Sequence, residues 1–240
     1  MLAALLAFQP AAVPADVPAL LGAMAAESRK LKSYRDEWLL VIESGGQKVQ
    51  LKVLRSIDGD RGGLMALAQD VPVLWLGSDG KKSFYISPQT ESFAEMTTGN
   101  AWSKVPTNFE PGGIKDGDFN FNFDGIYDLA ISSKPSLKLV GIESSIVDGE
   151  KARKATMEAK RPGSKGGVSL QLWLMADRWI PIRAEAEVTN AQGDASKFRA
   201  FRVRSDDKAT LSEQDFSFPT SAVEGFARVS WGKLVPGFSG

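Results

Sequence analysis

The feature that most constrains this fold is a repeated alternation of apolar and polar residues, interrupted by short segments rich in Gly and Asp. Residues 34–43 and 48–55 flank Ser-Gly-Gly-Gln at 44–47, and Asp79-Gly80 separates the next pair of alternating stretches. Alternation with a period of two is typical of strands that bury one face, and Asp-Gly or Gly-Gly pairs are typical of tight hairpin turns. The chain is therefore expected to fold as consecutive antiparallel hairpins.

The same pattern returns in the second half, where residues 180–188 alternate strictly. Ile180, Ile182 and the following small apolar residues are expected to face inward, and Arg183, Glu185 and Glu187 to face water. About ten strands are expected in all, at residues 34–43, 48–55, 71–77, 82–87, 91–96, 137–147, 151–160, 168–175, 179–189 and 196–204.

Two segments depart from the hairpin pattern. Residues 15–32 have helical periodicity, with Asp16 as the N-cap and Pro18 in the first turn. Residues 98–135 are rich in Gly, Asn, Pro and Phe and are too long for a hairpin connection, which is typical of a lid or a binding loop. The fold class is thus mainly β with few helices, in a single domain over residues 16–240.

Composition excludes several classes of function. The chain has no Cys and no His, so it has no thiol nucleophile, disulfide, thiolate metal site or Ser-His-Asp triad. Its 29 basic and 29 acidic residues balance, which argues against nucleic acid as a partner. No apolar run is long enough for a membrane-spanning helix, so contact with membranes is expected to be peripheral at most. We expect a monomer with no cofactor.

Residues 1–15 begin with a short apolar run and end in Val13-Pro14-Ala15, small residues before a potential cleavage at Asp16. This is the form of a short or truncated secretory signal segment, without its basic start. The expected location is the periplasm or another compartment of the cell envelope.

The stretch DGDFNFNFDG, residues 116–125, has the oxygen-rich look of a calcium loop. An EF-hand needs Gly at position 6 and Glu at position 12, and no register meets both requirements. In an extended segment the phenylalanines would share one face. They either pack on the sheet or form a flap over a cavity, and the lid candidates are Phe119, Phe121, Phe123, Ile126 and Leu129.

Glu185 and Glu187 form a same-face pair of carboxylates, which acid/base chemistry requires. The neighbouring strand carries Lys197 and Arg199, so cross-strand charge pairs on a solvated face are the simpler interpretation.

Three motifs, in order, resemble the LolA/LolB-like superfamily of bacterial lipoprotein carriers. Ser78-Asp-Gly-Lys81 leads into Phe84-Tyr-Ile-Ser-Pro88, Leu172-Trp-Leu174 leads into Ile180-Pro-Ile-Arg183, and Asp215-Phe-Ser-Phe-Pro219 is similar to the family's closing strand. The resemblance extends over most of residues 15–230. One departure is that Asp70-Val71-Pro72 lacks the Arg that latches the lid of the carriers, so neither that latch nor a specific cargo is carried over.

The resemblance implies a strongly curved antiparallel sheet, an incomplete β-barrel, with helices on its concave side and an apolar cavity between them for acyl chains. The cavity candidates are the inward apolar residues of the hairpins, namely Trp38, Leu40, Ile42, Val49, Leu51, Val53, Trp75, Phe84, Ile86, Leu170, Leu172, Leu174, Ile180 and Ile182.

Three functions are compatible with these observations. The first is a non-enzymatic carrier-like protein for a lipid, acyl chain or lipoprotein. The second is an envelope sensor or interaction module of the same fold, which acts through a protein partner. The third is a hydrolase that uses carboxylates, and it requires a pocket with converging Asp or Glu residues.

Overall fold

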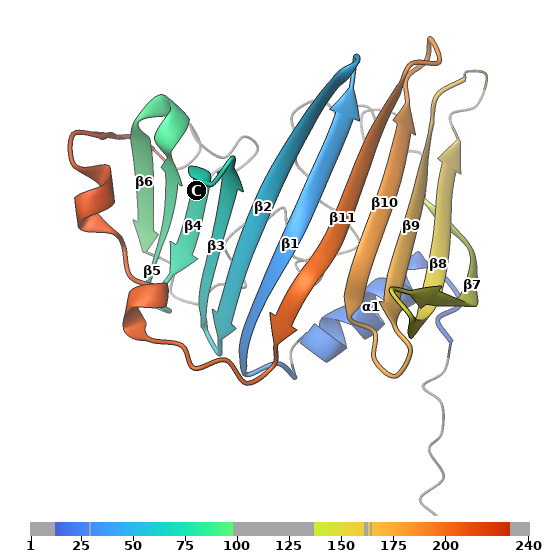
Figure 1. Ribbon diagram of the computed structural model, residues 1–240, viewed down its shortest axis with the longest axis horizontal. Helices are drawn as coiled ribbons and strands as arrows, with labels where there is room; N and C mark the ends of the chain where they lie inside the picture. The colour runs from blue at the N-terminus through green and yellow to red at the C-terminus, as the bar shows by residue number, and fades with distance from the viewer. Residues whose placement is uncertain (1–12, 29, 98–136, 161–162, 164, 231–240) are drawn as a thin grey trace, which may run out of the picture.

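The computed structural model describes residues 13–28, 30–97, 137–160, 163 and 165–230. They form one sheet of twelve strands in the order β12-β6-β5-β4-β3-β2-β1-β11-β10-β9-β8-β7 (Figure 1). The strands are β1 Ser33–Ser44, β2 Gln47–Asp58, β3 Arg61–Ala68, β4 Val71–Ser78, β5 Lys82–Ser87, β6 Ser92–Thr97, β7 Lys138–Val147, β8 Glu150–Lys160, β9 Gly167–Met175, β10 Pro181–Thr189, β11 Ala195–Asp206 and β12 Ala227–Arg228.

The prediction of a mainly β, antiparallel fold is confirmed. Every neighbouring pair is antiparallel except β12, which runs parallel to β6. All ten expected strands are present, and the sequence analysis missed β3 and β12. Within the described residues the sheet is open, with β7 and β12 at its edges. Its strong curvature remains a prediction.

The N-terminal helix α1 spans Val17–Ser28 and is shorter than predicted. Asp16 caps it as expected, because the backbone N–H of Ala19 donates to Asp16 Oδ1 at 2.8 Å. The helix lies behind β9 and β10 in Figure 1, and it buries Leu20, Leu21 and Met24 in the core. We call the surface of the sheet that packs with α1 the helix-side face, and the opposite surface the outer face.

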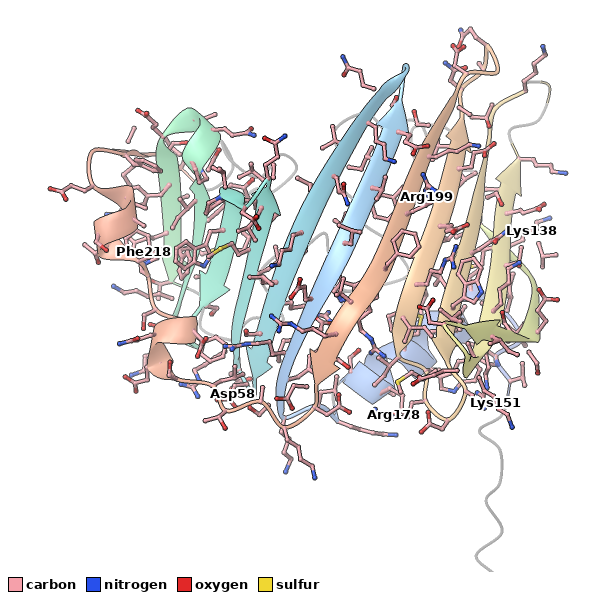
Figure 2. The ribbon with its side chains drawn as sticks, in the orientation of Figure 1. Asp58, Lys138, Lys151, Arg178, Arg199 and Phe218 are labelled. Carbon is pink, nitrogen blue, oxygen red and sulfur yellow. The ribbon has the colours of Figure 1, made fainter. Side chains whose placement is uncertain are left out.

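The C-terminal segment, residues 213–226, covers one half of the outer face. The Phe216 ring lies 4.9 Å from the Arg61 guanidinium on β3. Further along, the Phe218 ring packs 5.5 Å from Phe84 and 5.3 Å from Phe93, in front of β4–β6 in Figure 2. A side chain at Gly63 would come within 2.9 Å of the Asp215 carbonyl oxygen, so glycine is needed where this segment crosses β3.

The insertion at 98–135, with all five lid candidates, lies outside the described residues, as does most of the predicted signal segment 1–15. In the part of the chain that is described, no helix is long and apolar enough to cross a membrane.

Candidate functional site

The largest apolar surface of the sheet is the helix-side face. The cavity candidates in its core cluster are Trp38, Leu40, Ile42, Leu51, Val53, Leu170, Leu172 and Leu174. Val49 pairs with Ile42 near the turn of the first hairpin and is 47% exposed. Ile180 is buried beside the turn between β9 and β10, where its carbonyl accepts a hydrogen bond from Met175.

The prediction that Trp75, Phe84 and Ile86 belong to the same surface is wrong. Leu76 and Tyr85, which alternate with them, face the helix-side core, so these three residues point to the outer face. There they pack with the C-terminal segment and not with α1. Both faces of β4 and β5 are apolar, and no neighbouring segment in the sequence indicates that a second segment covers the outer face.

Ile182 is also on the outer face, where it packs with Val147, Ala152 and Trp173. The cause is a register shift in β10 between Pro181 and Arg183. A β-bulge inserts one residue and resets the alternation, so the strict inward series predicted for residues 180–188 begins only at Ala184.

Small side chains line the middle of the helix-side face. Ala155 on β8 pairs with Leu172, which pairs with Ala184 on β10, and Ala184 pairs with Ala200 on β11. We call Ala155, Ala184, Ala186 and Ala200 the alanine row; Ala155, Ala184 and Ala200 are buried and Ala186 is half-buried. Because a methyl group projects little above the sheet, a group that packs on this row can approach the sheet closely on either side of Leu172.

A buried polar cluster interrupts the apolar face near the start of β1. Asp36 is 1% exposed and accepts hydrogen bonds from the Tyr34 hydroxyl, the Trp38 indole and the Arg55 guanidinium. Burial, and next the negative charge of Asp36, raise the pKa of Tyr34 to about 12. The sequence does carry a sign of this cluster, because Asp36 occupies a position that alternation assigns to the inward face of β1, together with Trp38 and Leu40.

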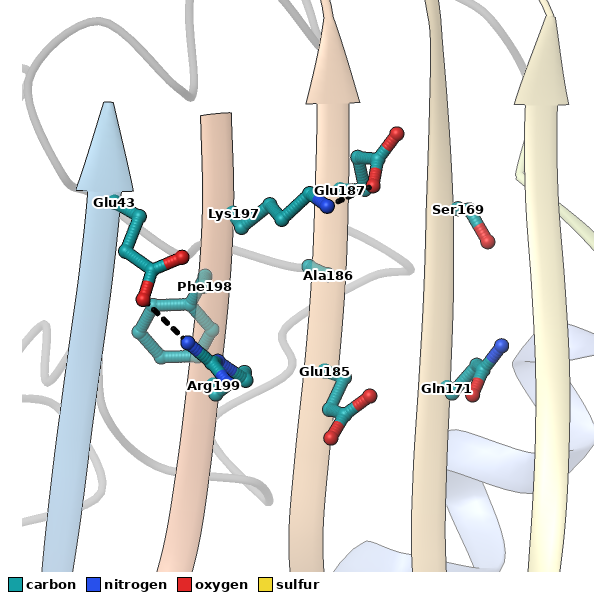
Figure 3. A pocket seen from close by; sticks show the side chains of 9 residues that line it. All are labelled: Glu43, Ser169, Gln171, Glu185, Ala186, Glu187, Lys197, Phe198 and Arg199. Atoms are coloured by element: carbon teal, nitrogen blue, oxygen red, sulfur yellow. Dashed lines mark hydrogen bonds and ion pairs between the residues drawn. The ribbon is translucent and has the colours of Figure 1, made fainter. Parts of the chain in front are cut away.

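The uncovered half of the outer face holds a groove of about 440 Å³ across β1, β11, β10 and β9. Figure 3 shows Glu43, Glu185 and Glu187 around it, together with Lys197 and Arg199. The predicted cross-strand charge pairs are present: Lys197 lies 3.5 Å from Glu187, and Arg199 lies 2.5 Å from Glu43.

These carboxylates do not form an acid/base pair. Glu185 binds Arg183 on its own strand, so each of the three carboxylates in the groove already has a cationic partner. Among the described residues, no group of three or more Asp or Glu is arranged to hold a metal ion.

The chain was compared with protein families, curated proteins and solved structures. No protein-family model and no curated protein sequence matches the chain. Among solved structures, the chain is similar to one in the complex of Pseudomonas aeruginosa MucA and MucB, with 16% identity, a TM-score of 0.42 and coverage of 83% of this chain and 60% of that one.

Two further structures match at similar levels. A LolA-superfamily protein from Nitrosomonas europaea has 11% identity and a TM-score of 0.35, over 87% of this chain and all of that one. The Mycobacterium tuberculosis lipoprotein LppX has 14% identity and a TM-score of 0.32, over 81% and 99% of the two chains. The matches include a member of the LolA superfamily, the group that the sequence motifs resemble.

Proposed function

We propose that this protein is a non-enzymatic component of the cell envelope that binds the acyl chain of a lipid or lipoprotein on its helix-side face. The observation that carries the proposal is the extent of the apolar surface. The core cluster contains residues from every strand from β1 to β11. Ten spacings of about 4.8 Å make this face about 48 Å wide.

Helix α1 is too small to cover that width. It has 12 residues, which corresponds to a cylinder about 18 Å long and about 10 Å across. The apolar face extends well beyond α1, and an acyl chain bound on it gains about 25 cal/mol for each Å² of apolar surface that the chain buries there. The alanine row is the part of the face best suited to a chain of methylene groups.

The predicted lid residues, Phe119, Phe121, Phe123, Ile126 and Leu129, are proposed to compete with the cargo for this face. A closed state and a loaded state would then exclude each other, and the cargo would shift the population between them. We propose that the protein works as a monomer in the periplasm.

Displacement of a fluorescent fatty acid, with native mass spectrometry of the purified protein, tests this function. Ala184→Phe places a ring on the alanine row and is expected to abolish binding. Glu185→Phe introduces the same side chain one residue later on the outer face, and is expected to leave binding unchanged. Absence of both co-purified lipid and displacement in the unmodified protein contradicts the proposal.

The second candidate function is a protein-interaction module, and the edge strand β7 favours it. Val140 and Ile146 on β7 are 63% and 71% exposed. In the described ranges no strand pairs with the outer edge of β7, so an extended peptide can add there as a further strand. A proline at Ser144 is expected to block such a partner without affecting fatty-acid binding, which separates the two functions.

A further inference from the structure

Arg153 is a cation placed on an otherwise apolar part of the helix-side face. It lies on β8, in phase with Ala155 and Met157, which both belong to the helix-side core. Its strand partner is Leu174 on β9, which is fully buried on the same face. Alternation therefore points Arg153 toward the surface that we propose for acyl chains.

The contacts of Arg153 leave part of its guanidinium unsatisfied. The group lies 4.4 Å from the centroid of the Trp179 ring, which accounts for one of its faces. Its Nη1 atom is buried and has no hydrogen-bond partner, and within the described part of the chain no acidic side chain forms an ion pair with it. A buried N–H group without an acceptor is costly, so this arrangement calls for an explanation.

Arg55, the buried arginine of this face, shows how a cation there is satisfied within the protein. Arg55 donates two hydrogen bonds to Asp36, at 3.0 and 2.6 Å. Arg153 has no such carboxylate. Its stacking on Trp179 explains why the side chain holds its position, but not why a charged group with a spare donor stands there.

The charged side chains of the helix-side face also favour an anionic ligand. On β1, β2, β8 and β11, the buried or half-buried charged side chains that face α1 are Asp36, Arg55, Arg153 and Arg202. Three positive charges stand against one negative charge, so these four strands carry an excess of two positive charges on this face. Such an excess complements an anion.

We propose that Arg153 binds the anionic head, a carboxylate or a phosphate, of an amphiphile whose acyl chain lies along the alanine row. This inference rests on the proposed function and adds the chemical class of the ligand. A guanidinium binds carboxylate and phosphate alike through paired N–H donors. The head satisfies Nη1, and the chain replaces the contacts that bury Ala155, Ala184 and Ala200 in this structure.

The test compares ligands that share one chain and differ in the head. Laurate, dodecyl phosphate and dodecanol displace a neutral fluorescent probe, N-phenylnaphthylamine, from the full-length protein at a pH where laurate is ionised. Hydrogen bonds to charged groups are strong enough that laurate and dodecyl phosphate are expected to bind about ten- to a hundredfold more tightly than dodecanol. Acetate and inorganic phosphate, which have no chain, are expected to displace nothing.

Two variants decide whether Arg153 is responsible. Arg153→Gln is expected to lower the affinity for laurate and dodecyl phosphate to that for dodecanol, and to leave dodecanol binding unchanged. Lys154→Gln removes the same charge from the next residue, which faces outward over Trp173, and is expected to retain the preference. If Arg153→Gln does not fold, Arg153→Lys is used instead. It keeps the charge and loses the paired donors, so the preference for laurate and dodecyl phosphate over dodecanol is expected to fall without disappearing, and an unchanged preference overturns the role of the paired donors.

The outcomes separate this inference from the proposed function. Equal binding of all three amphiphiles, or an unchanged preference in Arg153→Gln, overturns the role of Arg153 and leaves acyl-chain binding intact. Displacement by acetate or inorganic phosphate alone also overturns it, because the site would then recognise a free anion. If none of the amphiphiles binds, the proposed function itself fails.

Discussion

Arg55 and Asp36 form a two-point ion pair inside the helix-side core, with Nε donating to Oδ1 and Nη2 to Oδ2. The Tyr34 hydroxyl and the Trp38 indole donate to the same carboxylate, each at 2.7 Å. Asp36→Ala removes this shared acceptor, so we expect a loss of about 3–5 kcal/mol in the free energy of unfolding. Urea titration measures it. The control is Glu187→Ala, whose carboxylate is 48% exposed, and a similar loss in both variants would contradict the role of Asp36.

The raised pKa of Tyr34 predicts a stability change at high pH. The folded protein holds the phenolic proton up to about pH 12, whereas an unperturbed tyrosine releases it near 10. The contribution of the protonated Tyr34 to the free energy of unfolding is therefore fully present below about pH 10. It is lost as the pH rises through about 12, and the total loss is on the order of 2–3 kcal/mol. Ultraviolet absorbance of phenolate is expected to show one tyrosine that titrates near pH 12, and Tyr34→Phe is expected to lack this late phase. A variant that retains this late phase would assign it to another residue.

The ion pairs around the outer-face groove are expected to contribute little to stability. Lys197 and Glu187 are 3.5 Å apart, with side chains 56% and 48% exposed. Lys197→Gln is expected to change the free energy of unfolding by less than about 1 kcal/mol. That change should disappear in concentrated salt, because salt screens exposed charges. A larger effect that persists in salt would show that Lys197 has a role beyond a surface ion pair.

The hairpin order could be predicted from the sequence because each turn carries its own local signal. Asp79 illustrates this, since its carboxylate accepts hydrogen bonds from the backbone N–H groups of Lys81 and Lys82 and closes the turn by itself. β3 was missed because Gly62 and Gly63 near its start are typical of a loop. The glycine at 63 is explained by a contact with residue 215, which no local pattern reveals.

The candidate site was harder to predict than the fold. The helix-side residues of β1, β2 and β9 follow from alternation alone. Alternation cannot show which face of β4 and β5 meets α1 when both faces are apolar, and it failed at Ile182 because a bulge leaves no local mark in the sequence. Arg153 was not recognised as a candidate, since a charged residue in a strand is usually assigned to the solvent face.

The packing of the Phe84 ring over Gly77 gives a direct test of how β4 and β5 pair. The two residues are strand partners, and a side chain on Gly77 would overlap the Phe84 ring. That ring is 3% exposed and is held against Phe218, so it cannot move aside freely. Gly77→Ala is therefore expected to lower the free energy of unfolding by about 1–3 kcal/mol. Gly141→Ala, with no heavy atom within 4 Å of the added methyl group, is expected to change it by less than about 0.5 kcal/mol.

A second substitution shows whether the Phe84 ring is the cause. Phe84→Leu shortens the side chain above Gly77, so the Gly77→Ala change is expected to cost less in that background than in the unmodified protein, with a favourable coupling of about 0.5–2 kcal/mol. Urea unfolding of the four proteins in this double-mutant cycle gives the coupling. If the Gly77→Ala cost is the same with Phe or Leu at position 84, the ring does not lie over Gly77.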